Sequence, residues 1–146
     1  MEPEQTIKTV LPHLQARGDQ IAKTFLTDLL KRDPSLERIF AGTQEEVRQR
    51  LIVGFLTTVG ENLANESLLG RYLQKLGRQA RQHAVRGEHL SIAADAMLFA
   101  LRDACGPTWS AELEKVWFEA LVTTIQYVQE GLGPETSARV EGGVSI

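Results

Sequence analysis

The feature that most constrains this chain is the helical spacing of its apolar residues, which runs from residue 7 to residue 128. Apolar side chains recur every three or four positions, a pattern typical of amphipathic helices that share one core. No segment sustains the apolar-polar alternation of a half-buried strand, and no internal repeat is present. Asp33-Pro34, Ala41-Gly42 and Gly106-Pro107 interrupt the pattern. The sequence therefore predicts an all-α fold of six or seven helices joined by short corners.

Several of these interruptions contain residues that commonly cap the N-terminus of a helix. Asp33 stands directly before Pro34, so it is expected to cap a short third helix. Thr43, followed three residues later by Glu46, predicts a capping box for the next helix. Asn65 is the expected cap of the helix that follows. These signals predict where the central helices begin.

The two ends of the helical region carry their own signals. Pro12 should kink the first helix or mark its restart, because proline removes a backbone donor. Gly131 is expected to stop the last helix. Beyond it the chain is polar and contains glycine, which is typical of a frayed terminus. We therefore expect one domain over residues 1–132 and a disordered tail over residues 133–146.

Composition limits the function classes. The chain has 146 residues, the size of one domain, and its net charge of −3 implies no broad basic surface for nucleic acid. The lone Cys105 excludes an internal disulfide, and no Cys/His cluster has zinc spacing. No apolar run approaches the roughly 18 residues of a membrane span, and the N-terminus does not resemble a signal peptide. A cytoplasmic protein without a membrane or nucleic-acid partner is expected.

Several motifs, taken in order, resemble one family. The segment Leu76-Gly77-Arg78 is followed by the corner at residues 84–90, a helix that ends at Gly106 and a final helix that carries tryptophan. Residues 34–40 match a short third helix that ends in phenylalanine. The set resembles the bacterial single-domain globins and the globin domain of flavohemoglobins, a frame that neuroglobin-like chains share. The resemblance covers about residues 4–132 and implies a globin fold, heme as cofactor and a small diatomic ligand such as oxygen.

The chain also departs from this family at its functional positions. When the sequences are aligned through residues 76–78 and 88–89, the histidine that ligates heme iron in the family falls on Ala80, and a methyl group cannot bind iron. The distal tyrosine of flavohemoglobins falls on Leu26, and the tyrosine that supports the proximal histidine falls on Leu90. We expect no reductase domain in this protein. A nitric-oxide dioxygenase is therefore not expected, and a binding protein is favoured over an enzyme.

His83 is the candidate replacement for the lost iron ligand. It lies three residues after Ala80, which in a continuous helix keeps both on a similar face about 4.5 Å apart along the axis. A slide of this helix, or a shorter corner, would bring His83 to the iron. The alternative is a histidine that caps carbonyl groups at a helix end. His89 is expected to be a structural corner residue, and His13 a surface residue.

The resemblance implies further residues around a heme. The cofactor-binding candidates are Phe40, Arg48, Ile52, Ala80, Val85, Leu90 and Met97. Phe40 would stack on the macrocycle, and Arg48 would pair with a propionate or another carboxylate. Each has a structural alternative: Phe40 as plain core, Arg48 as a solvated cation, and Met97 as a buried apolar residue rather than a soft ligand.

Two functional hypotheses from different classes follow. The first is a heme-binding globin with non-standard proximal ligation through His83, suited to gas or redox sensing or to binding a diatomic molecule. The second is a heme-free globin-fold module for sensing or protein interaction, whose pocket holds a fatty acid or other apolar anion with Arg48 on its carboxylate. A substitution in an otherwise ordinary globin would explain Ala80, but not Leu26 or Leu90. A homodimer or a signalling partner is compatible with both hypotheses.

Overall fold

The computed structural model describes residues 3–133, and this range contains seven α-helices and two short 3₁₀ helices but no strand. Their bounds are α1 Pro3–Lys8, α2 Leu11–Arg32, η1 Pro34–Leu36, α3 Glu37–Phe40, α4 Glu45–Glu61, α5 Glu66–Arg81, α6 Gly87–Cys105, η2 Gly106–Thr108 and α7 Ala111–Leu132. The predicted all-α fold with short corners is confirmed. The tail predicted from residue 133 lies outside the described residues except for Gly133, so its boundary stays a prediction.

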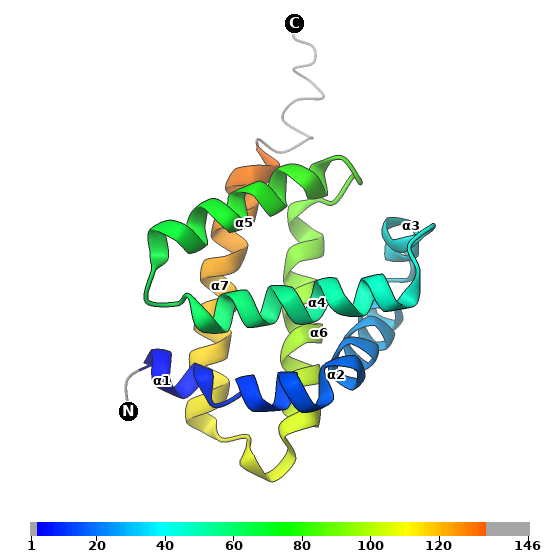
Figure 1. Cartoon of the computed structure of the whole chain (residues 1–146). Helices are drawn as coiled ribbons and strands as arrows, with labels where there is room; N and C mark the ends of the chain where they lie inside the picture. Colours follow the sequence, from blue (N-terminus) through cyan, green and yellow to red (C-terminus); the bar gives the residue numbers. More distant parts are fainter. Residues whose placement is uncertain (1–2, 134–146) are drawn as a thin grey trace, which may run out of the picture.

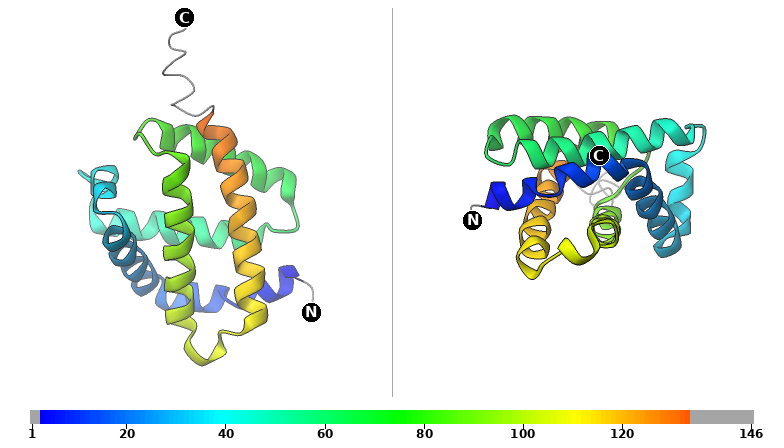
Figure 2. Two further views of the ribbon diagram at one scale, coloured as in Figure 1. Left: turned by 180° about the vertical axis from the view of Figure 1, so that it is seen from behind. Right: turned by 60° about the horizontal axis from the view of Figure 1, so that its bottom comes forward.

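The helices form two crossing layers. In Figure 1, α4 and α5 lie in front of α6 and α7, while α6 and α7 run side by side when seen from behind (Figure 2, left). Helix α2 packs on α4 and α6, and α5 packs mainly on α7. Within residues 3–133, neither α4 nor α5 makes more than sparse contact with α6. The two front helices are therefore supported by different partners, α2 and α7.

A single apolar core connects the layers. Its largest fully buried side chains come from several helices and are Ile7, Val10, Ile21, Leu56, Val59, Leu73, Leu101 and Trp117. Burial of each of these side chains contributes about 1.5–3 kcal/mol relative to exposure. Trp117 is fully buried, and its indole N–H has no hydrogen-bond partner among the described residues. No helix within residues 3–133 is long and apolar enough to cross a membrane.

Two glycines allow α5 and α7 to meet backbone to backbone. A Cβ added to Gly77 would lie 2.1 Å from the Val128 carbonyl oxygen, and a Cβ added to Gly131 would lie 2.0 Å from the Gln74 carbonyl oxygen. Only residues without a Cβ fit this crossing. The prediction that Gly131 stops the last helix is wrong. Helix α7 continues to Leu132, because this glycine serves the close approach of two helices rather than a turn.

The predicted caps mostly hold. The Asp33 carboxylate accepts a backbone N–H two residues later at 3.1 Å, and the Asn65 side chain accepts one three residues later at 3.3 Å. Helix α2 begins at Leu11 with Pro12 in its first turn, so Pro12 marks a restart as predicted. The kink inside α2 lies farther along, at Arg17, whose φ of −132° and ψ of 29° are not helical.

Candidate functional site

Helix α5 presents two distinct faces. Gly77 and Arg81 lie on the face toward α7, where Arg81 Nη1 donates to a backbone carbonyl of that helix at 3.2 Å. Leu73, Ala80 and Leu76 lie on the adjoining face, rotated from Gly77 by about 40°, 60° and 100° around the helix axis. Leu73 is buried, whereas Leu76 and Ala80 are only half-buried. Ala80, on which the resemblance predicts the iron ligand, is therefore half-buried on an apolar face beside the one that meets α7.

The chain leaves α5 through a Schellman motif. The Ala84 N–H donates to the Arg81 carbonyl at 3.1 Å, and the Val85 N–H donates to the Ala80 carbonyl at 3.2 Å. Ala84 has a φ of 61°, the left-handed region that this motif normally gives to glycine. The hydrogen bond between Val85 and Ala80 brings together two of the predicted site residues through their main chains.

His83 lies within this corner and its side chain is exposed. The expectation that it shares a helix face with Ala80 is wrong, because α5 ends at Arg81. The corner is held from α3: Arg38 Nη1 donates to the His83 carbonyl at 3.0 Å and Nη2 donates to the Ala84 carbonyl at 3.3 Å. Ligation of a buried metal by His83 therefore requires the corner to change its path.

The other soft or nitrogen donors have structural surroundings. His89 is buried, and its Nδ1 accepts the Arg86 backbone N–H at 3.0 Å at the start of α6, so the neutral ring carries its proton on Nε2. Met97 and Cys105 are buried in the core, and burial raises the pKa of the Cys105 thiol. Within the described part of the chain, no group of three or more His, Cys, Asp or Glu side chains could hold a metal ion.

Arg48 is engaged at the corner between α3 and α4. Its Nη2 donates to the Phe40 carbonyl at 2.7 Å, its Nε donates to the Thr43 carbonyl at 3.1 Å, and its guanidinium carbon lies 5.7 Å from the centre of the Phe40 ring. Helix α4 begins at Glu45 without a side-chain cap, so the capping box predicted between Thr43 and Glu46 is wrong. The Arg48 side chain, rather than a hydroxyl, ties this corner together.

The apolar candidates occupy the interior or its edge. Ile52 and Met97 are buried, whereas Phe40, Val85 and Leu90 are half-buried and Phe40 and Leu90 pack against the core. Two half-buried residues of the same kind that were not among the predicted cofactor-binding residues are Phe55 on α4 and Leu76 on α5. Arg38 was missed as well. Its two acceptors lie 45 and 46 residues away, and no local pattern contains that information.

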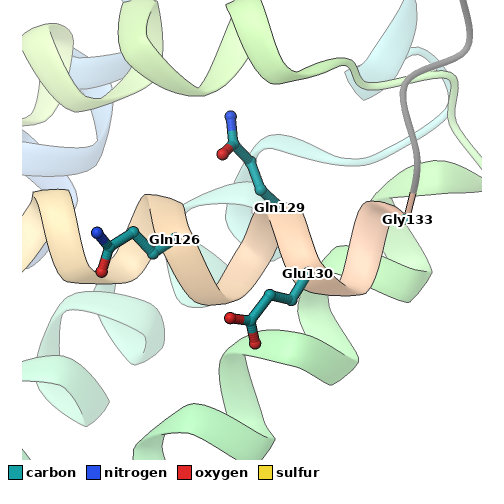
Figure 3. Close-up of a pocket in the computed structure, with 4 residues that line it drawn as sticks. All are labelled: Gln126, Gln129, Glu130 and Gly133. Carbon is teal, nitrogen blue, oxygen red and sulfur yellow. The ribbon is translucent and has the colours of Figure 1, made fainter. Parts of the chain in front are cut away.

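A separate surface hollow lies at the C-terminal end of α7 (Figure 3). It measures about 640 Å³ and is lined by Gln126, Gln129, Glu130 and Gly133. The three long side chains point away from the helix in different directions (Figure 3), and Glu130 accepts a hydrogen bond from Gln74 at 2.6 Å. This open, polar hollow offers no nucleophile and no convergent donor set, so it is not the candidate site.

Comparison with known sequences gives one consistent relationship. No protein-family model matches the chain. Flavohemoproteins do: that of Bordetella pertussis is 23% identical over 121 residues, which is 82% of this chain. That of Halalkalibacterium halodurans is 24% identical over 146 residues, or 97% of this chain, and that of Bacillus subtilis is 27% identical over 120 residues. The chain spans about a third of the length of these relatives, since it covers 30%, 36% and 30% of them.

Solved structures define the fold class. A bacterial globin from Campylobacter jejuni superposes with a TM-score of 0.78 at 18% identity, covering 89% of this chain and 94% of that one. A hexacoordinated heme protein from a tardigrade gives 0.76 at 13% identity, with coverage of 90% and 94%. An engineered carbene transferase from Rhodothermus marinus gives 0.78 at 18% identity and covers 99% of this chain and 96% of that one. The chain therefore has the globin fold. In sequence it is similar, at low identity, to the globin domain of flavohemoproteins.

Proposed function

We propose that this chain is a heme-binding globin with non-standard proximal ligation, and that it binds a small diatomic molecule for gas or redox sensing. The observation that carries the proposal is the half-buried apolar face of α5 around Ala80, on a helix that is seated on α7 and has only sparse contact with α6. The likeness to flavohemoproteins and to globin structures supports the same function class.

The residues fit the apolar macrocycle of a heme but lack the family's bond to its iron. Leu76 and Leu90 offer half-buried apolar contacts from two helices, whereas Ala80 offers no donor. A bound heme would supply an iron atom to which a diatomic ligand can bind. Of the chain's three histidines, His89 is used at the start of α6 and His13 lies beside η2, with its Nε2 3.5 Å from a threonine hydroxyl there. His83 is therefore the residue that would bind the iron.

The free energy needed to open the corner that contains His83 is smaller than the stability of the domain. The two hydrogen bonds from Arg38 are exposed and together contribute about 1–2 kcal/mol. Release of Ala84 from its left-handed conformation returns about 1 kcal/mol, because the Cβ of alanine is disfavoured there. Opening the corner also breaks the two hydrogen bonds of the Schellman motif, which together contribute about 1–3 kcal/mol. The net cost of about 1–4 kcal/mol is below the stability of a domain, about 5–15 kcal/mol.

Titration of the purified protein with hemin tests the proposal. We expect one heme per chain and an absorption spectrum that changes when His83→Ala removes the proposed ligand. His13→Ala is the matched control and should leave the spectrum unchanged. A spectrum of the bound heme that survives His83→Ala would overturn the assignment of His83. Failure of the unmodified chain to bind heme at all would overturn the function.

The second candidate is a heme-free globin-fold module for sensing or protein interaction. Ala80 at the ligand position and the exposed side chain of His83 favour it. The version in which Arg48 holds a fatty-acid carboxylate is less favoured, because this guanidinium already donates to two backbone carbonyls. Ala80→His separates the two functions. Heme uptake by this variant, with none by the unmodified chain, would show a globin frame from which only the ligand has been lost.

A further inference from the structure

The outer face of α6 and α7 carries a small apolar groove. In the view from behind, these two helices lie side by side nearest the viewer (Figure 2, left), on the opposite side of the molecule from α4 and α5. The groove has a volume of about 170 Å³, and Ala94, Leu98, Leu121 and Ile125 form its apolar lining. Asp95 supplies a charged group at the same groove. Nothing in the proposed heme site uses this face.

Large apolar side chains protrude beside the groove. Phe118 and Val122, which also line it, are 52% and 39% exposed. These are two of the five large hydrophobic residues that are exposed within residues 3–133. Of the other three, Leu51 and Leu68 lie singly on α4 and α5, and Phe99 lines a separate hollow between α2 and α6. A clustered apolar patch, unlike single exposed residues, marks a contact surface.

The charged residues on either side of Phe118 are complementary to the same residues in a second copy of the chain. Lys115 and Glu119 lie one turn apart on α7, with Phe118 between them in sequence. Neither takes part in an ion pair within the described residues. If two α7 helices pair antiparallel about an axis near Phe118, Lys115 of each copy comes within reach of Glu119 of the other. A partner with the same sequence therefore satisfies both charges.

The face is large enough for a stable pair. Helices α6 and α7 contain 19 and 22 residues. An antiparallel pair about an axis near Phe118 overlaps residues 111–125 of α7, about 22 Å, and α6 is about 28 Å long; with a width of about 10 Å for each helix, this gives roughly 500 Å² per copy. A pair would bury roughly 1,000 Å² in total, which reaches the size of a specific interface and fits a reversible dimer.

We propose that a second copy of this chain occupies this face. The two copies are related by a two-fold axis, and Phe118 of each lies against the α6–α7 groove of the other. A two-fold pairing uses the same patch twice, which explains why groove, protruding ring and opposite charges occur together on one surface. Because α4 and α5 lie on the other side, the pairing leaves the candidate heme site uncovered.

Sedimentation equilibrium of the full chain between about 1 and 200 μM tests the proposal. We expect a reversible dimer, at least about thirtyfold weaker in Phe118→Glu, since a central interface aromatic contributes about 2 kcal/mol or more. Leu51→Glu is the matched control: this residue is 65% exposed on α4, and its replacement should not change dimerisation. Circular dichroism of both variants confirms that they are folded.

Exchange of the charges at Lys115 and Glu119 tests the antiparallel pairing of the two α7 helices. Lys115→Glu or Glu119→Lys alone should weaken the dimer about threefold to tenfold, because each juxtaposes like charges twice across the axis. The double exchange should restore it. A monomer throughout this concentration range would overturn the proposal and leave the face to a different partner. A dimer that is unaffected by Phe118→Glu would place the interface elsewhere and would overturn it equally.

Discussion

The crossing of α5 and α7 predicts an unusually severe effect of adding one methyl group. In Gly77→Ala, the new Cβ would lie 2.1 Å from the Val128 carbonyl oxygen and 2.9 Å from the Gly131 Cα. Ordinary contacts of a Cβ begin at about 3.4 Å, so α5 would have to move by more than an ångström. The atoms in its way belong to the backbone of a 22-residue helix and cannot rotate aside.

The magnitude follows from two opposing terms. Alanine is favoured over glycine within a helix by about 0.8–1 kcal/mol, which would stabilise the variant. Overpacking typically costs about 1–3 kcal/mol and more when backbone must shift. Because backbone is the obstacle at Gly77, we expect overpacking to prevail, with a net loss of about 2 kcal/mol or more in the free energy of unfolding.

Urea denaturation followed by circular dichroism measures this loss, and the chain supplies its own control. Gly54 lies on α4 and is exposed, and a Cβ added there would have no atom within 4 Å. Gly54→Ala should therefore stabilise the protein by about 0.5–1 kcal/mol through helix propensity alone. Equal stabilisation by Gly77→Ala would refute the backbone contact between α5 and α7.

Three further predictions concern the corner and the acid stability. Ala84→Gly should stabilise the protein by about 0.5–1 kcal/mol in urea denaturation, since glycine accepts the φ of 61° without strain. Arg38→Gln should speed amide hydrogen exchange at the corner after α5 by roughly tenfold, because two hydrogen bonds to its carbonyls are lost. Hydrogen bonds from the Arg102 guanidinium, and then from Trp109, lower the pKa of the Glu114 carboxyl. The ionised carboxylate therefore stabilises the fold at pH values above the pKa that Glu114 has in the unfolded chain. This stabilisation is lost as the pH falls through the pKa of the folded protein. Glu114→Gln should therefore be less stable than the unmodified chain at about pH 7, with a smaller difference at about pH 3, in parallel urea titrations.

The sequence predicts most of the features whose cause is local, although the capping box expected at Thr43 does not form. The apolar period predicts the helices, and Asp33 and Asn65 cap them as expected, because a cap bonds N–H groups only two or three residues away. The candidate site, in contrast, depends on contacts between residues that are far apart in the sequence. The acceptors of Arg38 are 45 and 46 residues away, and Gly131 serves a contact with another helix that local reasoning mistakes for a turn. The helical position expected for His83 is wrong for a related reason, since helical spacing does not continue past the residue where α5 ends.

The direct seating of α5 on α7 has a thermodynamic consequence. Helix α7 carries the glycine contact on one side and Phe118 on its outer side, so it belongs both to the support of the candidate heme site and to the proposed face between copies. A ligand that displaces α5 must also move α7, which costs free energy. A second copy of the chain that holds α7 in place changes this cost. Linkage makes the two effects equal: the factor by which occupancy alters dimer affinity is the factor by which dimerisation alters affinity for the occupant. A single rigid helix–helix contact would thus make protein concentration an effector of ligand binding.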